Sequence, residues 1–283
     1  MGRRRHFKID AAILLIAFFG ALYWQRVTLL DWYRVWQKPA LPAAVTYEDV
    51  VRQQVLSLDV ETPSVEEPLV PADVVPDTTT PPETAPEEIV ENILPVSINL
   101  AVPFTAQAPS GNWDLPFEEA CEEASIYMAD LFYAQEPEGQ VATARAEAEI
   151  LKIVEFEKSL FGYYEDTTIE QTGLLLEQMY GRTVELVEKP TIDDLKKYLV
   201  AGHPVIVPTF GQALGNPYYQ QPGPVYHMLV LRGYTKDGFI TNDPGTRHGE
   251  AYFYTFDRVM DAMHDWNNGN VEQGKKAVLV VTP

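Results

Sequence analysis

The sequence predicts an α+β domain from residue 96 to the C-terminus, with helices first and a mostly antiparallel sheet after them. Between Phe117 and Val200 apolar residues recur at helical spacing, whereas short runs rich in β-branched and aromatic residues dominate from Pro204 onward. Such an order packs early helices against a later sheet. Two changes of composition upstream give three zones: a membrane segment (1–38), a linker (39–95) and the domain (96–283).

Helical patterns fill the first part of the domain. The helix expected from Phe117 to Tyr133 would bury one face, made of Ala120, Ala124, Tyr127, Met128 and Leu131. Further helices are expected at Thr143 to Leu160, at Ile169 to Tyr180 before the stop Gly181, and at Ile192 to Val200 between the cap Thr191 and Gly202.

Strand patterns fill the second part. The expected strands are Pro204 to Phe210, Val225 to Tyr234, Gly238 to Thr241, Ala251 to Phe256 and Ala277 to Val281. A last helix, Asp257 to Trp266, is expected to interrupt them.

The N-terminus carries an apolar run, AAILLIAFFGALYW, from Ala11 to Trp24, behind Arg3, Arg4, Arg5 and Lys8. No small-residue cleavage site follows promptly, so an uncleaved signal anchor is favoured over a removed signal peptide. Extending the helix from Ile9 to Leu30 gives a span of about 20 residues. Positive charge before the run predicts a single-pass protein of the cell membrane, with a cytoplasmic N-terminus and an extracytoplasmic C-terminal domain.

The stretch from Pro39 to Pro95 is typical of a disordered linker. It holds ten prolines, no glycine and one basic residue, Arg52, among many acids. Such a chain cannot bury enough apolar surface to fold and extends instead. A short helix from Tyr47 to Leu58 is possible within it, because apolar residues recur there at helical spacing.

Charge and cysteine content exclude several classes of function. A formal net charge of -20 argues against nucleic acid as a partner, because phosphate binding needs clustered Lys and Arg. One cysteine excludes an internal disulfide and a multi-cysteine zinc site. His203 and His248 lack companions at ligand spacing, so neither a metal nor any other cofactor is expected.

Three residues could together perform thiol chemistry. Cys121 is expected near the start of a helix, where free backbone N–H groups favour a thiolate. His227 lies in one expected strand and Asp243 at the end of the next, and a tight turn near Asp237 would bring them within reach. An imidazole oriented by a carboxylate can take a thiol proton.

These residues stand in a frame that resembles the C39-like peptidase family, whose fold is papain-like. The similar segments are Val102-Pro-Phe-Thr-Ala-Gln107, Asn112-Trp113, Cys121 at a helix start, Tyr226-His-Met-Leu-Val-Leu-Arg-Gly-Tyr234 and Asn242-Asp-Pro-Gly245. The resemblance implies a cysteine peptidase with Cys121 as nucleophile, His227 as base and acid, Asp243 as the orienting carboxylate and Gln107 as an oxyanion donor.

One departure from the family pattern leaves two functions open. Glu122 and Glu123 follow Cys121 where Gly-Pro is more usual. The sequence alone does not determine whether their net effect is to raise or to lower the thiol pKa. The chain is therefore expected either to hydrolyse peptide or isopeptide bonds of a peptide or protein substrate, or to be a catalytically inactive, surface-anchored binding module. Removal of leader peptides on the cytoplasmic side is disfavoured by the expected orientation.

Overall fold

The computed structural model describes residues 40–60 and 94–283. The chain divides into a short unit, Met1–Leu41, and a larger one, Pro42–Pro283, to which nearly all described residues belong. The expected membrane segment and residues 61–93 of the expected linker lie outside the described residues. In the part that is described, no helix is both long enough and apolar enough to cross a bilayer.

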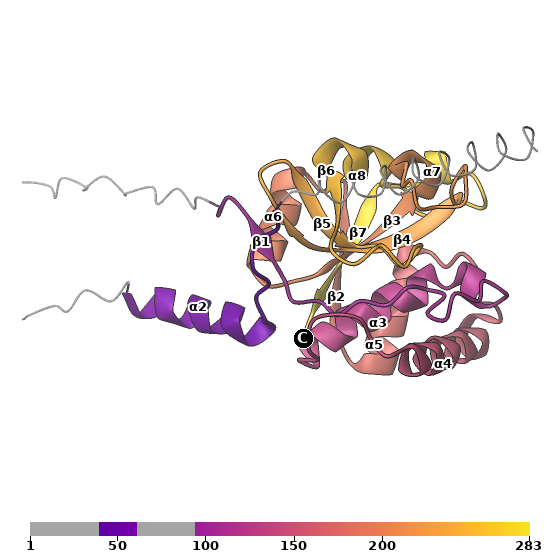
Figure 1. Cartoon of the computed structure of the whole chain (residues 1–283), viewed down its shortest axis with the longest axis horizontal. Helices are drawn as coiled ribbons and strands as arrows, with labels where there is room; N and C mark the ends of the chain where they lie inside the picture. Colours follow the sequence, from indigo (N-terminus) through magenta and orange to yellow (C-terminus); the bar gives the residue numbers. More distant parts are fainter. Residues whose placement is uncertain (1–39, 61–93) are drawn as a thin grey trace, which may run out of the picture. The chain divides into compact units, whose positions relative to one another are not determined.

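A seven-stranded antiparallel sheet forms the centre of the larger unit (Figure 1), in agreement with the predicted fold class. Its order is β2-β7-β3-β4-β5-β6, and β1 pairs with β4. The strands are β1 (Ile98–Asn99), β2 (Thr183–Glu188), β3 (Val205–Phe210), β4 (Tyr226–Tyr234), β5 (Gly238–Asn242), β6 (Tyr252–Thr255) and β7 (Ala277–Thr282). Strands β1 and β2 were not predicted from the sequence. The other strands begin and end within one or two residues of their predicted bounds.

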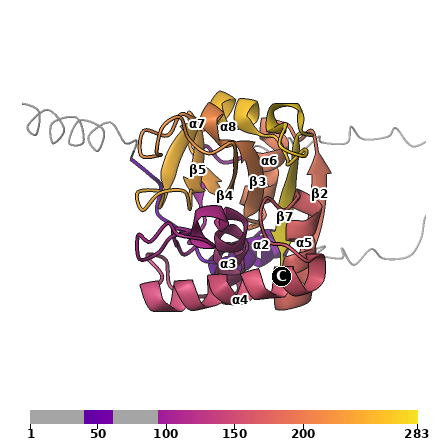
Figure 2. The ribbon, with the colours of Figure 1, turned by 90° about the vertical axis from the view of Figure 1, so that its right-hand side faces the viewer.

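The α-helices of the described residues are α2 (Tyr47–Val60), α3 (Cys121–Tyr133), α4 (Thr143–Phe161), α5 (Ile169–Tyr180), α6 (Ile192–Val200), α7 (Gly211–Leu214) and α8 (Phe256–Ala262). Figures 1 and 2 show α3, α4 and α5 gathered on one side of the sheet, with α8 on the other. Thr191 and Gly181 bound their helices as expected, the first through a capping box and the second with a φ of 66°.

Two expected helices have different bounds. The stretch from Phe117 to Tyr133 is broken at Ala120, whose ψ of 34° is not helical, so a 3-10 turn, Phe117–Glu119, precedes an α-helix that begins at Cys121. The last helix ends at Ala262 rather than Trp266, because Met263 is extended and bridges to Thr209 on β3. Both breaks lie beside residues of the candidate site.

Part of the expected linker carries structure. Val45 bridges to Leu100, Val50 is buried, and the ring of Tyr47 packs edge-on against that of Tyr133 with centroids 5.0 Å apart. A Cβ on Gly202 would come within 2.8 Å of Val50, so the contact is close. The expectation of a disordered linker from residue 39 therefore does not hold for this stretch, where α2 (Tyr47–Val60) forms and where Val45, Tyr47 and Val50 contact the domain.

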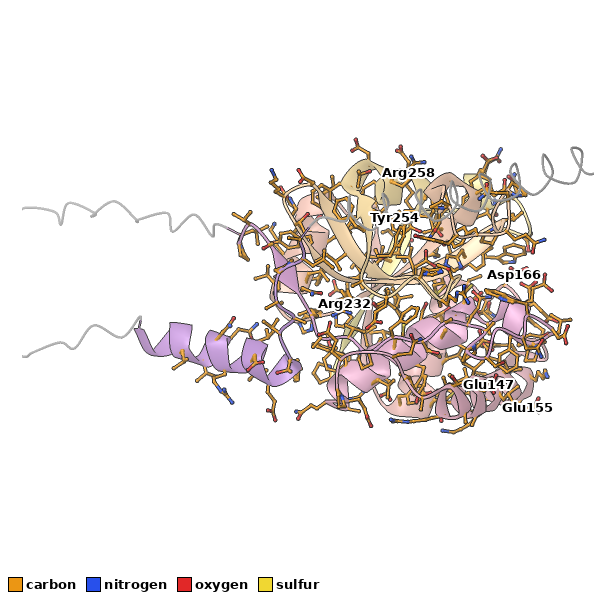
Figure 3. All side chains as sticks on the ribbon, viewed as in Figure 1. Glu147, Glu155, Asp166, Arg232, Tyr254 and Arg258 are labelled. Atoms are coloured by element: carbon orange, nitrogen blue, oxygen red, sulfur yellow. The ribbon has the colours of Figure 1, made fainter. Side chains whose placement is uncertain are left out.

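All residues of strand β4 are buried. Its pairing with β5 shifts register between Leu231 and Gly233, and Arg232 stands at this bulge. The Arg232 guanidinium is fully buried (Figure 3), with Nε donating to Asn99 Oδ1 at 3.0 Å and NH2 pairing with Glu138. A buried charge needs such partners, so the bulge and its neighbours are fixed together.

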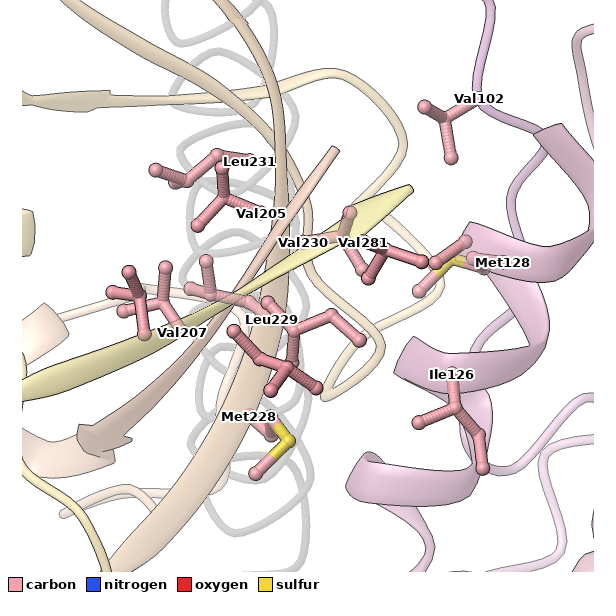
Figure 4. Close-up of a cluster of buried hydrophobic side chains, with 14 of the residues drawn as sticks. Val102, Ile126, Met128, Val205, Val207, Met228, Leu229, Val230, Leu231 and Val281 are labelled. Atoms are coloured by element: carbon pink, nitrogen blue, oxygen red, sulfur yellow. The ribbon is translucent and has the colours of Figure 1, made fainter. Parts of the chain in front are cut away.

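The main core lies between α3 and the sheet. Ile126 and Met128 project from α3 on one side, and Met228, Val230 and Val281 lie among the strands (Figure 4). Each of these five side chains is wholly inaccessible to solvent. Burying side chains of this size stabilises the fold by about 1.5–3 kcal/mol each, so α3 is held firmly on β4.

Two buried carboxyl groups lie between α3 and α4. Glu123 and Glu157 are fully buried, and their carboxyl groups interact with each other but with no hydrogen-bonding group of any other residue among those described. Burial raises the pKa of Glu157 to about 8, with Glu122 and Glu165 adding to the rise. Burial and the proximity of Glu157 raise the pKa of Glu123 well above its usual value. Both groups therefore remain protonated in the folded protein near neutral pH.

This pair makes stability fall as the pH rises. Between the usual glutamate pKa and about 8, the unfolded chain loses a proton that Glu157 keeps in the folded state, so the free energy of unfolding decreases. We expect Glu157→Gln to stabilise the protein at pH 8 by about 1–3 kcal/mol relative to wild type, and to have little effect at pH 4. Urea unfolding at several pH values measures this.

The matched control is Glu155→Gln, on the same helix but with a side chain that is 74% exposed (Figure 3). It should leave the pH dependence unchanged. A Glu157→Gln variant with the same pH dependence as wild type would contradict a protonated buried pair.

Candidate active site

Cys121 is the first residue of α3, and a small apolar cluster holds this end of the helix. The cluster joins Phe117 and Ala120 to residues of α3 and α4 and to Tyr164. Ala120 offers no side-chain cap, so the first N–H groups of the helix are left for other acceptors. The Cys121 side chain is 6% exposed, and its sulfur lies against the backbone N–H of Met228 on β4. The helix start thus places the only thiol of the chain beside the residue that follows His227.

His227 and Asp243 make the contact expected from the hairpin. His227 Nε2 lies 2.8 Å from Asp243 Oδ1, and the side chains are 2% and 0% exposed. The register pairs Val230 with Asn242, so Asp243 follows the last residue of β5 and reaches diagonally across to β4. When the Nε2–H of a neutral imidazole donates a hydrogen bond to Asp243, Nδ1 carries the free lone pair. Nδ1 can then accept a proton from another group.

Asp243 is held by donors from several segments. Besides His227, the donors to its two oxygens are Gly245 N (3.0 Å to Oδ1), Asn216 Nδ2 (2.9 Å), Tyr219 OH (2.7 Å) and Tyr254 OH (2.6 Å), the last three to Oδ2. Burial alone would raise the pKa of this carboxyl, but the His227 charge and the hydrogen bonds from His227, Tyr254 and Tyr219 outweigh it, so the pKa is lowered. Asp243 is therefore an anion that orients the imidazole.

Glycines let the backbone approach the imidazole. A Cβ on Gly245 would lie 2.9 Å from His227 Cε1 and 2.9 Å from Tyr219 Cε1, and one on Gly211 would lie 3.0 Å from His227 Cβ. All three distances are shorter than normal carbon contacts, so larger residues would displace the ring. The position of His227 is thus fixed by close packing as well as by Asp243.

Gln107 reaches the same site. Its backbone N–H donates to Pro244 O at 2.9 Å, which joins its loop to the Asp243 turn. Its side-chain amide is buried, and Nε2 donates to Phe117 O at 3.1 Å and to Glu118 O at 2.8 Å. These two carbonyls occupy both amide protons, so Gln107 would have to exchange at least one bond to donate to an oxyanion.

The thiol of Cys121 is hydrogen-bonded to Glu122 rather than to His227. Sγ donates to Glu122 Oε2 at 2.9 Å, and no hydrogen bond joins it to the imidazole within the described part of the chain. Burial raises the pKa of the thiol well above its usual value, and Glu122 and Glu123 add to the rise. Burial and Glu123 also raise the pKa of Glu122 itself. The resting thiol is therefore protonated.

A cavity of about 680 Å³ opens in front of these groups. Cys121, His227 and Gln107 line it together, so the structure brings three of the four expected site residues to one space, with Asp243 directly behind the imidazole. The rest of its lining includes Trp113, Glu118, Glu119, Asp166, Tyr218 to Tyr226, Gly245 and Trp266.

Several residues that shape the site were not found from the sequence. Asn216 and Tyr254 hold Asp243, yet a lone Asn in a loop and a Tyr in a strand carry no distinguishing pattern. Tyr219, in the loop before the His227 strand, also holds Asp243 and likewise carries no distinguishing pattern. His203 lies elsewhere, against Tyr133, whereas His248 stacks on Tyr218, a residue of the cavity lining. No group of three or more potential metal ligands exists among the described residues.

Glu122→Gln tests the electrostatic link between Cys121 and its neighbour. Once Glu122 has ionised, its charge raises the thiol pKa, and the neutral amide of Gln carries no such charge, so we expect the midpoint of the pH profile of Cys121 alkylation to shift to lower pH. Iodoacetamide labelling from pH 6 to 10, followed by intact mass, gives the profile. An unchanged midpoint, or one that also shifts in Glu155→Gln, would contradict the link.

Comparisons with known proteins identify the family of the chain. No curated protein matches the chain. A solved structure described as a C39-like peptidase from Bacillus anthracis is 16% identical, with a TM-score of 0.45 over 66% of this chain and 98% of its own. The model of the Peptidase_C39 like family matches residues 99–271, which include every expected site residue. Since this match covers more than half of the chain, the chain belongs to the C39-like peptidase family.

Proposed function

We propose that this protein is a thiol peptidase that hydrolyses peptide or isopeptide bonds, with Cys121 as nucleophile, His227 as general base and acid, and Asp243 as the group that orients His227. The contact of His227 Nε2 with the buried Asp243 carboxylate carries the proposal, because it leaves Nδ1 to face the cavity that Cys121 also lines. Membership of the C39-like peptidase family supports the same assignment.

The reaction starts when the thiol turns from Glu122 to the imidazole. Rotation about χ1 of Cys121 would exchange the Glu122 contact for His227 Nδ1, which accepts the thiol proton. The thiolate attacks the amide carbonyl, and the imidazolium returns its proton to the leaving amine. Water then attacks the thioester, again with His227 as base, and releases the acid and the free thiol.

The oxyanion of the tetrahedral intermediate needs nearby donors. The backbone N–H of Cys121, at the uncapped start of α3, is one candidate. Gln107 is the other, as the resemblance implies, and it lines the same cavity. Its role requires that Nε2 releases Phe117 O or Glu118 O when substrate binds.

We infer the location of the reaction from the sequence alone. An apolar N-terminal run behind three arginines favours a membrane anchor with the domain outside the cytoplasm, and the proline-rich stretch after it favours a tether. Such a tether suits a substrate at the cell surface. Membrane fractionation of the full chain, with protease treatment of intact cells, would contradict this if the domain stayed soluble or protected.

The peptidase proposal predicts a loss of activity on substitution of the nucleophile or the base. Cys121→Ser and His227→Ala should each lower the cleavage of a peptide library by at least about 10³-fold, because each removes a group that the chemistry requires. The measurement is mass spectrometry of the library after incubation with residues 42–283, the unit that contains α2. Thermal unfolding of each variant separates lost chemistry from lost folding.

Activity that survives Cys121→Ser would exclude the thiol mechanism. A matched control is His203→Ala, which removes a histidine that contacts Tyr133 outside the cavity lining and should leave cleavage unchanged.

A catalytically inactive binding module is the second candidate function. The hydrogen bond from Cys121 to Glu122 favours it, because a protonated thiol beside a carboxyl is a poor nucleophile. The two functions differ in thiol reactivity. A peptidase should react with iodoacetamide at pH 7 faster than free cysteine does, and His227→Ala should remove the excess, whereas a binding module should show no excess in either form.

A further inference from the structure

The cavity in front of Cys121 has an acidic wall. Glu118, Glu119 and Asp166 line it, and within the described part of the chain its lining includes no lysine or arginine. Asp166 lies at the end of the molecule where α3 begins (Figure 3). Among the ion pairs of the described residues, none involves these three carboxyl groups. The wall therefore carries negative charge that the protein does not neutralise.

These carboxyl groups repel one another. Burial raises the pKa of Glu119, and the charges of Asp166, Glu118 and Glu165 raise it further. Burial likewise raises the pKa of Asp166, with Glu165 adding to the rise. A cation that entered the cavity would relieve this repulsion, whereas an anion would increase it.

Two further features of the cavity indicate a ligand. His227 is 2% exposed at its side chain, and its Nδ1 has no hydrogen-bond partner among the described residues although the ring lines the cavity. Aromatic side chains form part of the wall: Trp113 is 44% exposed, and the ring of Trp266 lies tilted against that of Tyr226 with centroids 5.5 Å apart. Aromatic faces beside carboxylates suit an ammonium or guanidinium group.

We propose that this cavity binds a positively charged group of the substrate, from a lysine or arginine side chain or a free amine, close to the amide that Cys121 attacks. The proposal rests on the proposed function for the identity of the reacting amide. The charge preference itself belongs to the cavity and is measurable without turnover.

The single cysteine makes the cavity directly measurable, because any thiol reagent that modifies the chain reports on Cys121. The probes are two methanethiosulfonates of similar size, one with an ethylammonium and one with an ethylsulfonate group. The thiolate attacks the reagent, a mixed disulfide forms and methanesulfinate leaves. At pH 8 and low salt we expect the cationic reagent to react at least about tenfold faster, after division by the same ratio for 2-mercaptoethanol. The ratio of rates cancels the reactivity of the thiol itself.

A triple variant assigns the preference to the wall. Glu118→Gln, Glu119→Gln and Asp166→Asn together should bring the normalised ratio close to one. The matched control removes the same number of charges from exposed positions outside the cavity, Glu155→Gln, Glu177→Gln and Asp261→Asn, and should keep the wild-type ratio. A wild-type ratio near one, or a ratio that the triple variant retains, would overturn the proposal.

Peptides identify the source of the cation. Three otherwise identical series carry a lysine, an arginine or a free amino terminus next to the scissile bond, and a fourth carries glutamate. Preference for one of the cationic series supports the proposal and names the group, whereas equal cleavage of cationic and glutamyl peptides overturns it. A high reagent ratio in a protein that cleaves no peptide would remove the peptidase assignment and keep the cationic site.

Discussion

The hydrogen bonding of one buried carboxylate, Asp243, determines how the candidate site is arranged. An ionised carboxylate with no exposed surface is stable only when donors surround it. These donors come from β4, from β6, from the loop after α7 and from the turn that follows β5. Because each donor has to reach the same two oxygens, segments far apart in sequence are brought to one point, and the orientation of His227 follows from it.

The carboxyl groups behind Cys121 have the opposite environment. Glu122, Glu123 and Glu157 are buried where few donors reach them, so burial raises the pKa of each, while the donors around Asp243 lower the pKa of that residue. One fold therefore keeps one acid ionised and others protonated at the same pH. While they hold their protons, the three glutamates place no full negative charge beside the sulfur. This is how a glutamate pair after the nucleophile can be accommodated at all.

The sequence predicted the elements whose signals are local. Gly181 and Thr191 mark helix ends because their caps depend only on the local backbone. The strand that contains His227 is buried throughout, so its apolar sequence predicts it clearly. Strand β2 was missed because it is a sheet edge with mostly exposed, polar residues, and it forms only through pairing with β7 at the end of the chain. The helix of residues 47–60 was only a possibility, since its stability depends on contacts with Tyr133 and Gly202 that are distant in sequence. The hydrogen bond of Cys121 to Glu122 depends on side-chain rotamers, which no spacing predicts.

The segments that carried the family resemblance prove to be parts of one contact. Asn242 Nδ2 donates to Val102 O at 3.1 Å and to Pro103 O at 2.9 Å, and the backbone N–H of Gln107 donates to Pro244 O. The Val102-Pro-Phe and Asn242-Asp-Pro-Gly segments thus fix each other through backbone carbonyls, which requires an amide at position 242 and proline geometry beside it. Such a frame places a nucleophile and a base without specifying the charge around them. The charge in the cavity comes instead from the side chains of Glu118, Glu119 and Asp166 in its wall, while Glu122 behind the sulfur accepts the hydrogen bond of the thiol.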